Sequence, residues 1–318
     1  MLTLVDEELH RPGSDRNWQE SFYFNWTSAT TREFGLTRIG LNRAAATADA
    51  LVIILRDGRL DFAYAAIGVP ISDELWSQPM ADGLTIGRLT YTMLEPGTAW
   101  RLHLTGADEL DLTWTAFTPL VDFAGCFPGD EHAGQEHFEQ AGRVRGTIIR
   151  KGTQRTIDGT GERDKSWGVR DWAGINGWEW IAAQFGDDLA FNATSTDVTG
   201  TRQPAGFVYD AGRVRHVTEV RVDYTWHAEH QPSGARIEVG TADGGHYVFT
   251  ARAEARVPLV KKGLLIEETP AVFETTIDGV CRTGRGVLEH AYHVTTLETL
   301  LRLPRLLPLA RHALERGR

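Results

Sequence analysis

Cysteine is nearly absent from this chain, since its 318 residues include only Cys126 and Cys281. So few cysteines exclude a fold that depends on a disulfide framework, and we expect both thiols to be reduced. No apolar run approaches the roughly 18 residues that a membrane span requires. The first residues carry acids where a signal peptide needs positive charge and then an apolar run. These features together predict a cytoplasmic protein.

Positive charge is also scarce. Lys and Arg number 33 against 43 Asp and Glu, so the formal net charge is −10. A nucleic-acid surface depends on clustered Lys and Arg, and the body of the chain has no basic stripe. The chain has neither a phosphate loop nor a Gly-x-Ser-x-Gly elbow. We therefore expect no nucleic-acid partner and no bound cofactor.

Tryptophan is abundant, with 10 residues. Because Trp is large, rigid and partly polar, it lines apolar pockets as well as filling cores. Hydrophobic residues make up 42% of the chain, which is enough for a sizeable core. The composition therefore suggests a small apolar molecule as ligand.

Short alternating segments with turn residues between them dominate the chain up to residue 295. Phe22, Phe24 and Trp26 alternate on one face of one such segment, SFYFNWTS, and Trp26 is a candidate substrate-binding residue. Asp57-Gly58 separates two other segments in the manner of a tight hairpin. Similar turn signals stand at 187–188, 210–212 and 243–245. Recurrence every 8–12 residues is typical of all-β sandwiches and barrels.

A loop rich in Gly, Pro and acids at 123–137 suggests the domain boundary. We expect a lead-in at 1–17 within an N-terminal β domain, 1–135, followed by a second β domain, 136–295. The tail, 296–318, is rich in leucine and arginine, with Pro304 and Pro308 breaking what would otherwise be one helix. Two interpretations remain open: weak contact with a membrane surface, or a short helix that packs its leucines onto the barrel.

The run GERDKSWGVRDWAGINGWEW, residues 161–180, concentrates the candidate functional groups. If it is extended, Asp164 points to one face while Arg163 and Lys165 point to the other. Asp164 facing an apolar interior would stay protonated and could donate a proton to an alkene or a tertiary alcohol. Aromatic faces would stabilise the resulting carbocation; the candidates are Trp167, Trp172, Trp178 and Trp180.

The same residues also have structural interpretations. Arg170 and Asp171 could form a salt bridge that holds a loop, and the tryptophans could plug the barrel ends. Asp164 could cap a loop through backbone N–H groups. Spacing alone does not decide between these roles.

The segment GTGERDKSWGVRDW resembles the motif of the carotenoid 1,2-hydratase (hydroxyneurosporene synthase) and AttH-like superfamily. The matching residues are Gly161, Asp164 and the pair Trp167-Gly168. An opening Trp-x-Glu-Ser, Trp18 to Ser21 with Glu20, and a late glycine–acid pattern that ends at Glu289 resemble a bacterial branch of that superfamily.

The resemblance implies two lipocalin-like antiparallel β-barrels side by side, and family activities that include water addition to isoprenoid double bonds. It makes Asp164 the proton donor, although Arg163 and Lys165 replace the Tyr or His that often flanks it. We expect a cofactor-independent hydratase, dehydratase or cyclase acting on an apolar isoprenoid-like or polycyclic substrate. A non-catalytic carrier or sensor and a pericyclase are the alternatives.

Other candidates carry less weight. Glu289 and Glu20 are possible second polar groups, and Glu289 could instead partner an arginine such as Arg282. The pairs His227-x-x-His230 and His290-x-x-His293 resemble metal-binding pairs. Residues three apart on a strand point to opposite faces, so chelation within either pair is not expected and no metal site is predicted. His137 and Glu136 lie at the loop and receive the same interpretation.

Overall fold

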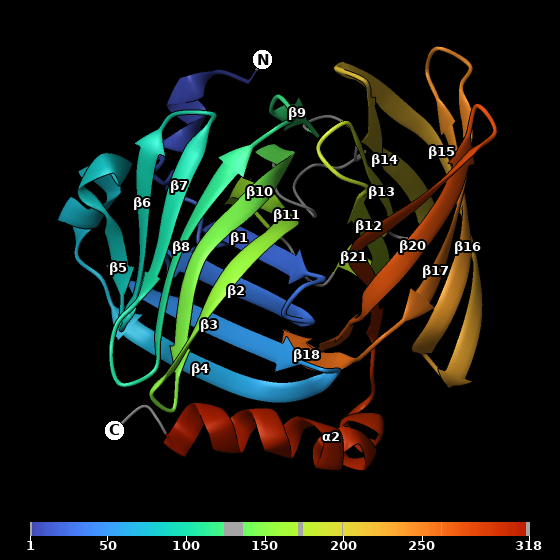
Figure 1. The fold of residues 1–318 in the computed structure, drawn as a ribbon. Coiled ribbons are helices and arrows are strands. Elements are labelled where there is room, and N and C mark those ends of the chain that lie inside the picture. Colours follow the sequence, from blue (N-terminus) through green and yellow to red (C-terminus); the bar gives the residue numbers. More distant parts are fainter. Residues whose placement is uncertain (1, 124–135, 171–173, 199, 262, 316–318) are drawn as a thin grey trace. The chain divides into compact units, whose positions relative to one another are not determined.

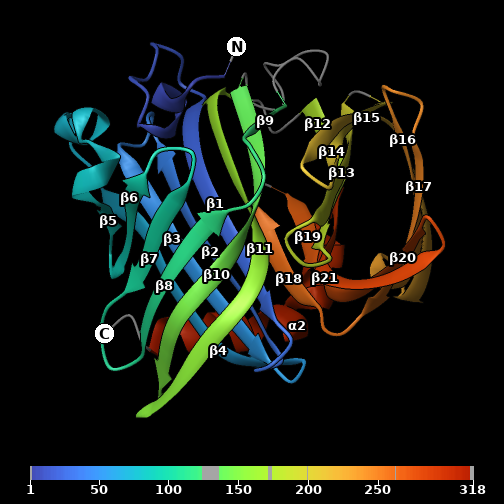
Figure 2. The same ribbon diagram turned by 45° about the horizontal axis from the view of Figure 1, so that its top comes forward.

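The computed structural model describes residues 2–123, 136–170, 174–198, 200–261 and 263–315. These residues fall into two compact units, divided after Arg170, and each is built on one curled antiparallel sheet (Figures 1 and 2). Apart from three short 3-10 turns (η1–η3) and one C-terminal helix, the elements of the described residues are strands. The prediction of an all-β protein with two barrel-like sheets is confirmed.

The first unit holds an 11-stranded sheet. Its main path runs β4-β3-β2-β1-β11-β10-β8-β7-β6-β5, and β9 pairs with β10. The hydrogen bond from the Arg88 N–H to the Tyr64 hydroxyl, 2.8 Å long, connects the β4 edge to the β5–β6 hairpin. The strands are β1 (Trp18–Ser28), β2 (Glu33–Asn42), β3 (Thr47–Arg56), β4 (Arg59–Pro70), β5 (Leu84–Ile86), β6 (Leu89–Glu95), β7 (Ala99–Leu104), β8 (Glu109–Ala116), β9 (Val121–Asp122), β10 (Glu136–Arg150) and β11 (Thr153–Val169).

Alternation of side chains places one face of this sheet in a packed interior. The side chains of Phe22, Phe24 and Trp26 on β1 all point into that interior, where Trp100 and Trp114 join them. All five are at most 1% exposed. The interior of the first sheet is therefore filled with aromatic core. The 3-10 turns are η1 (Leu4–Glu7), η2 (Asp73–Ser77) and η3 (Met80–Asp82).

The second unit holds a 10-stranded sheet in the order β12-β13-β14-β15-β16-β17-β20-β21-β19-β18. An additional pairing of β12 with β21 closes the first eight strands of this path into a barrel. The strands are β12 (Ile175–Gln184), β13 (Leu189–Val198), β14 (Thr201–Asp210), β15 (Arg213–Ala228), β16 (Gln231–Thr241), β17 (His246–Ala253), β18 (Val257–Lys261), β19 (Leu264–Glu268), β20 (Pro270–Ile277) and β21 (Val280–His293).

The turn signals in the sequence coincide with hairpins. Asp57 and Gly58, both with positive φ (50° and 72°), join β3 to β4. The turns at 187–188, 210–212 and 243–245 likewise connect consecutive paired strands.

The domain division differs from the expected boundary after residue 135. Strands β10 and β11, which we expected to open the second domain, pair with β8 and β1 of the first sheet. The first unit therefore continues to Arg170, and the second sheet begins at Ile175. The reason is pairing along the full length of β10 and β11, which the composition of the preceding loop does not reveal.

The tail forms one helix, α2 (Thr296–Glu315), with Pro304 and Pro308 inside it. The expected break is wrong. The prolines are four residues apart on one exposed face, so water can satisfy the carbonyls that lack a helical N–H partner. Four leucines are also exposed, by 66%, 55%, 41% and 47%: Leu297, Leu300, Leu303 and Leu307.

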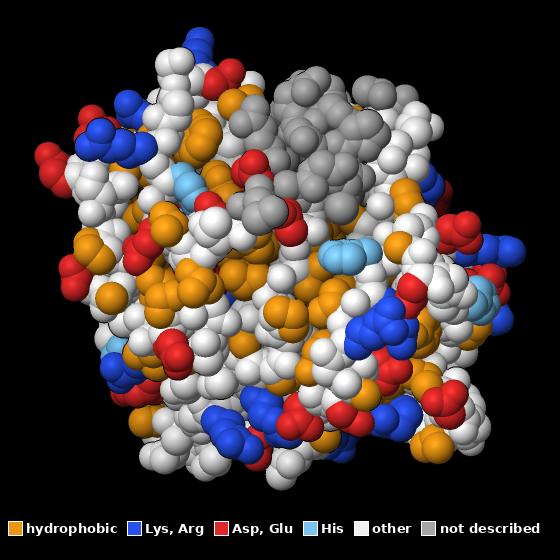
Figure 3. Space-filling view, turned by 90° about the horizontal axis from the view of Figure 1, so that it is seen from above, with side chains coloured by type: hydrophobic (Ala, Val, Ile, Leu, Met, Phe, Trp, Pro, Cys, Tyr) orange, Lys and Arg blue, Asp and Glu red, His pale blue; other side chains and the backbone are white. Residues whose placement is uncertain are grey.

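No helix among the described residues is long and apolar enough to cross a membrane. Among the described residues of the face shown in Figure 3, acidic and basic side chains are interspersed with apolar ones. Cys281 is exposed and unbonded, whereas Cys126 lies outside the described residues.

Candidate functional site

Asp164 lies on β11, between β1 and β10. Its register partners are Tyr23 on β1 and Glu139 on β10, and Tyr23 is in turn paired with Arg38 on β2. Laterally paired residues share a face of a sheet, so these four side chains form one row. Phe22 and Phe24 flank Tyr23 and point into the core, so the row lies on the opposite face.

This arrangement reverses the expected one. Asp164 does alternate with Arg163 and Lys165, but the two cations point into the apolar interior, where they are 1% and 0% exposed. The interior tolerates them because acids meet them there. Arg163 donates to both carboxylate oxygens of Glu7, at 2.9 and 2.5 Å, and Lys165 Nζ lies 2.9 Å from Glu20 Oε1.

The N-terminal residues supply these partners, so they are not a detached lead-in. Glu7 is fully buried, and Lys165 also donates to the backbone carbonyls of Asp6 and Glu8, each at 2.6 Å. The acids of the opening LVDEEL segment were visible in the sequence, but their pairing with residues about 155 positions later was not.

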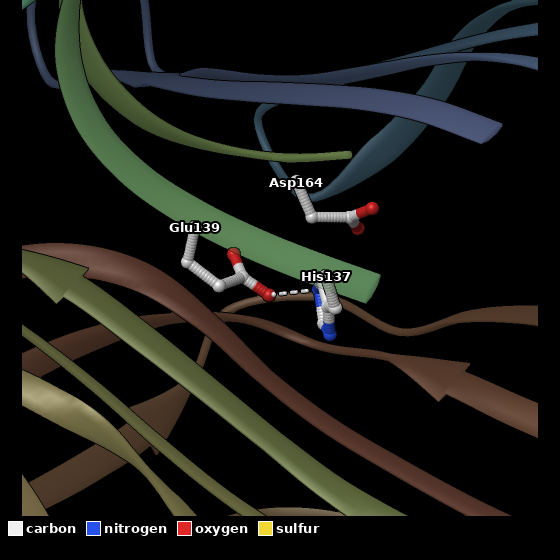
Figure 4. A group of neighbouring side chains, drawn as sticks. All are labelled: His137, Glu139 and Asp164. Carbon is white, nitrogen blue, oxygen red and sulfur yellow. Dashed lines mark ion pairs between the residues drawn. The ribbon is translucent and has the colours of Figure 1, made fainter. Parts of the chain in front are cut away.

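Three titratable side chains converge on the Asp164 face. One ligand atom from each of His137, Glu139 and Asp164 lies within 4.8 Å of the other two (Figure 4). His137 Nε2 is 2.9 Å from Glu139 Oε1. His137 and Glu139 are two apart on β10, which puts both on the face that Asp164 shares. We call these three residues the His–Glu–Asp cluster.

Two buried guanidinium groups act on this cluster. Burial lowers the pKa of Arg170 to about 10 and also lowers that of Arg38, while attraction to Asp164 opposes both shifts. The Arg38 guanidinium extends over Gly40, where a Cβ would come within 2.5 Å of it, and Arg170 Nη2 donates to Ser166 Oγ at 2.8 Å. Because the attraction is mutual, the two arginines favour a charged carboxylate at Asp164.

His137 is held neutral. Burial lowers its pKa from 6.5 to about 4, outweighing the opposite effect of Asp164, so at pH 7 it is an uncharged imidazole. A neutral imidazole beside carboxyl groups can accept a proton from water or from a substrate. The cluster therefore combines a proton acceptor with carboxyl groups that can exchange protons.

The His–Glu–Asp cluster also has the donor atoms of a metal site. One imidazole and two carboxylates suit several divalent ions. Arg38 and Arg170 oppose this use, because both guanidiniums interact with Asp164 and their positive charges repel a cation there. The arrangement fits proton transfer to an organic ligand better than it fits a bound cation.

Glycine lets β11 approach β1 closely. A Cβ at Gly161 would lie 1.9 Å from the Asn25 carbonyl oxygen, and one at Gly159 would lie 2.1 Å from the Thr27 carbonyl oxygen. The glycines before Asp164 therefore fix the strand that carries it.

Three other candidates belong to the interior of the first unit. Trp26 is fully buried core. Glu20 is fully buried and contacts both His10 and Lys165. Burial alone would raise the pKa of Glu20, but attraction to Lys165 outweighs burial and lowers that pKa below its usual value. Trp167 stacks on His10 with centroids 4.1 Å apart. These residues anchor the N-terminal segment and do not share the face of Asp164.

The remaining candidates lie in the second unit. Trp178 and Trp180 share one face of β12 and Glu179 takes the other, as alternation predicts. Glu289 is the register partner of Trp180 and accepts a hydrogen bond from Trp178 Nε1, while burial raises its pKa. Its neighbour Leu288 points into the barrel core, so Glu289 faces away from the barrel interior.

The proposed partner Arg282 donates instead to Asp188, at 2.6 Å. Asp171 and Trp172 lie outside the described residues.

Sequence reasoning missed Arg38 and Glu139 and set His137 aside as part of a loop. The His-x-Glu spacing at 137–139 was the available signal, because two residues in a strand share a face. It was obscured by the loop composition just before β10.

The comparisons with known proteins agree with this architecture. A domain of unknown function, DUF7064, matches residues 3–294. The chain belongs to this family. No curated protein matches the chain by sequence.

Several solved structures share the fold. A putative AttH from Nitrosomonas europaea has a TM-score of 0.62 at 17% identity, covering 89% of this chain and 94% of that one. Kievitone hydratase from Nectria haematococca has a TM-score of 0.65 at 11% identity, covering 93% and 94%. CghA has a TM-score of 0.65 at 11% identity, covering 88% and 89%. At these identities the likeness shows the fold alone.

Proposed function

We propose that this protein is an enzyme that adds water to, or removes water from, an apolar isoprenoid-like or polycyclic substrate without a cofactor, or closes a ring in it. The observation that carries the proposal is the His–Glu–Asp cluster. It puts a neutral imidazole and two carboxyl groups within 4.8 Å of one another, beside two buried guanidiniums. The fold shared with kievitone hydratase and CghA supports it.

Hydration would use the cluster in a closed proton cycle. Asp164, carrying a proton, gives it to one alkene carbon, and a carbocation forms at the other. Water bonds to that carbon and loses a proton to neutral His137. The resulting imidazolium, whose pKa is about 4, returns the proton to Asp164. Dehydration is the same sequence reversed. In ring closure a second double bond replaces the water, and the carbocation that remains loses a neighbouring C–H proton to His137 to leave a new double bond.

Opposing effects adjust the proton on Asp164. Arg38 and Arg170 favour its carboxylate, whereas the carboxyl group of Glu139, close by, disfavours a second negative charge. A balance between these opposing effects suits a group that must both donate and accept a proton during one turnover.

The experiment is a panel of apolar alkenes and the corresponding alcohols, incubated with the full-length protein in water enriched in oxygen-18. Hydration is detected by mass spectrometry as a product carrying one labelled oxygen, and cyclisation as a product of unchanged mass with a new retention time. His137→Gln should lower the rate of hydration of any converted substrate at least tenfold. Binding of panel members without conversion would instead support a carrier.

A further inference from the structure

The two His-x-x-His pairs, at 227–230 and 290–293, remain outside the proposed function. The structure separates the members of each pair but brings one histidine of each together. His230 Nδ1 lies 3.3 Å from His290 Nε2. His230 occupies the turn between β15 and β16, and His290 lies on β21, paired with Glu179 on β12. All four elements belong to the second unit.

The two imidazoles approach through their nitrogens. Their ring centroids are 5.6 Å apart and their planes differ by only 12°, so the rings are nearly parallel. The usual distance from zinc to an imidazole nitrogen is about 2.05 Å. Two such nitrogens on one tetrahedral ion therefore lie roughly 3.3 Å from each other. The observed separation of 3.3 Å matches that value.

The nitrogens on the far sides of both rings face carboxylates. His290 Nδ1 is 3.8 Å from Glu179 Oε1, and His230 Nε2 is 3.9 Å from Glu229 Oε1. Histidines that bind metals commonly direct the second ring nitrogen to a carboxylate, which orients the ring and raises its basicity. Here a carboxylate oxygen lies near the second ring nitrogen of each histidine, beyond hydrogen-bond distance.

The surroundings also suit a cation that arrives from solvent. The His230 side chain is 37% exposed, whereas that of His290 is 11% exposed, so solvent reaches the pair from the His230 side. Tyr292 stacks on His230 with centroids 4.0 Å apart and limits its rotation. Arg202 adds one positive charge, but it pairs with Glu179.

We propose that His230 and His290 form a divalent transition-metal site, for Zn²⁺, Ni²⁺ or Cu²⁺, with water or a ligand atom completing the coordination. The site is separate from the His–Glu–Asp cluster, to which it contributes no residue. Its open positions make it suited to hold an oxygen or nitrogen donor of a second small molecule.

The test is calorimetric titration of metal-free, full-length His137→Asn protein with Zn²⁺, where this substitution disables the His–Glu–Asp cluster as a competing site. One equivalent should bind, and His230→Asn or His290→Asn should weaken binding at least tenfold. Asparagine suits position 230, where φ is +57°, so that variant should keep its fold, as circular dichroism can verify.

His227→Asn is the matched control, because it removes an exposed histidine of the same motif, and it should bind Zn²⁺ like the parent. The d–d absorption of Cu²⁺ should show nitrogen ligation in the parent and lose it in the His230 variant. No binding by the parent, or equal binding by the His230 and His227 variants, would overturn the proposal and leave a hydrogen bond between two histidines.

Discussion

The buried pair between Glu7 and Arg163 gives the sharpest prediction about stability. Glu7 is fully buried, Arg163 is 1% exposed, and they are joined by two hydrogen bonds. Glu7→Gln leaves a guanidinium with only neutral partners among the rings of Phe24, Trp100 and Trp114. Removing one partner of a buried pair costs about 3–5 kcal/mol.

For a unit of this size, that loss corresponds to a decrease in Tm of about 6–20 °C. Thermal unfolding followed by near-ultraviolet circular dichroism measures it. Glu74→Gln, which removes an exposed acid of the same unit, is the control and should change Tm by no more than a degree or two.

The double variant Glu7→Leu with Arg163→Met should recover most of the loss, because two apolar groups replace the two charges in an apolar interior. A Glu7→Gln variant within about 1 kcal/mol of the parent would refute the view that the N-terminal segment neutralises the barrel interior.

Three further predictions concern other parts of the molecule. The pKa of His137 is about 4 in the folded protein and 6.5 in the unfolded chain, so the stability that this residue contributes is complete above pH 6.5 and falls as the pH decreases toward 4. In chemical denaturation, His137→Gln should therefore flatten the dependence of the unfolding free energy on pH. Gly161→Ala forces a Cβ against the Asn25 carbonyl and should destabilise by about 1–3 kcal/mol or more. Gly13→Ala should not, because its Cβ would meet only Trp18 Cε3, at an ordinary contact distance of 4.0 Å. The exposed leucines of α2 lie in a tail with five arginines and two glutamates, so the protein should bind anionic vesicles. Replacing Leu300, Leu303 and Leu307 by serine should abolish cosedimentation of the protein with these vesicles, whereas the control Leu94→Ser should not.

The sequence predicted the local elements well and the long-range ones poorly. Alternation and turn chemistry identified the strands and hairpins, because both depend on neighbouring residues. The place of β10 and β11 in the first sheet depends on pairing with β8 and β1, which no local pattern encodes.

In the candidate site, too, local features could be predicted from the sequence and long-range contacts could not. Alternation correctly separated Asp164 from Arg163 and Lys165, but it cannot say which face is interior. The proton-donor role considered for Asp164 placed that residue in the apolar interior and the cations in solvent. The structure does the reverse because Glu7 and Glu20 neutralise the cations inside the barrel, and that depends on tertiary contacts.

The central claim is that Asp164 transfers the substrate proton. The most direct measurement is the single-turnover rate of Asp164→Asn against the parent on a converted substrate in deuterium oxide, with deuterium at carbon followed by mass spectrometry. Loss of a general acid should lower the rate of carbon deuteration by about 100-fold or more. An Asp164→Asn variant that deuterates carbon within about threefold of the parent rate would contradict the account.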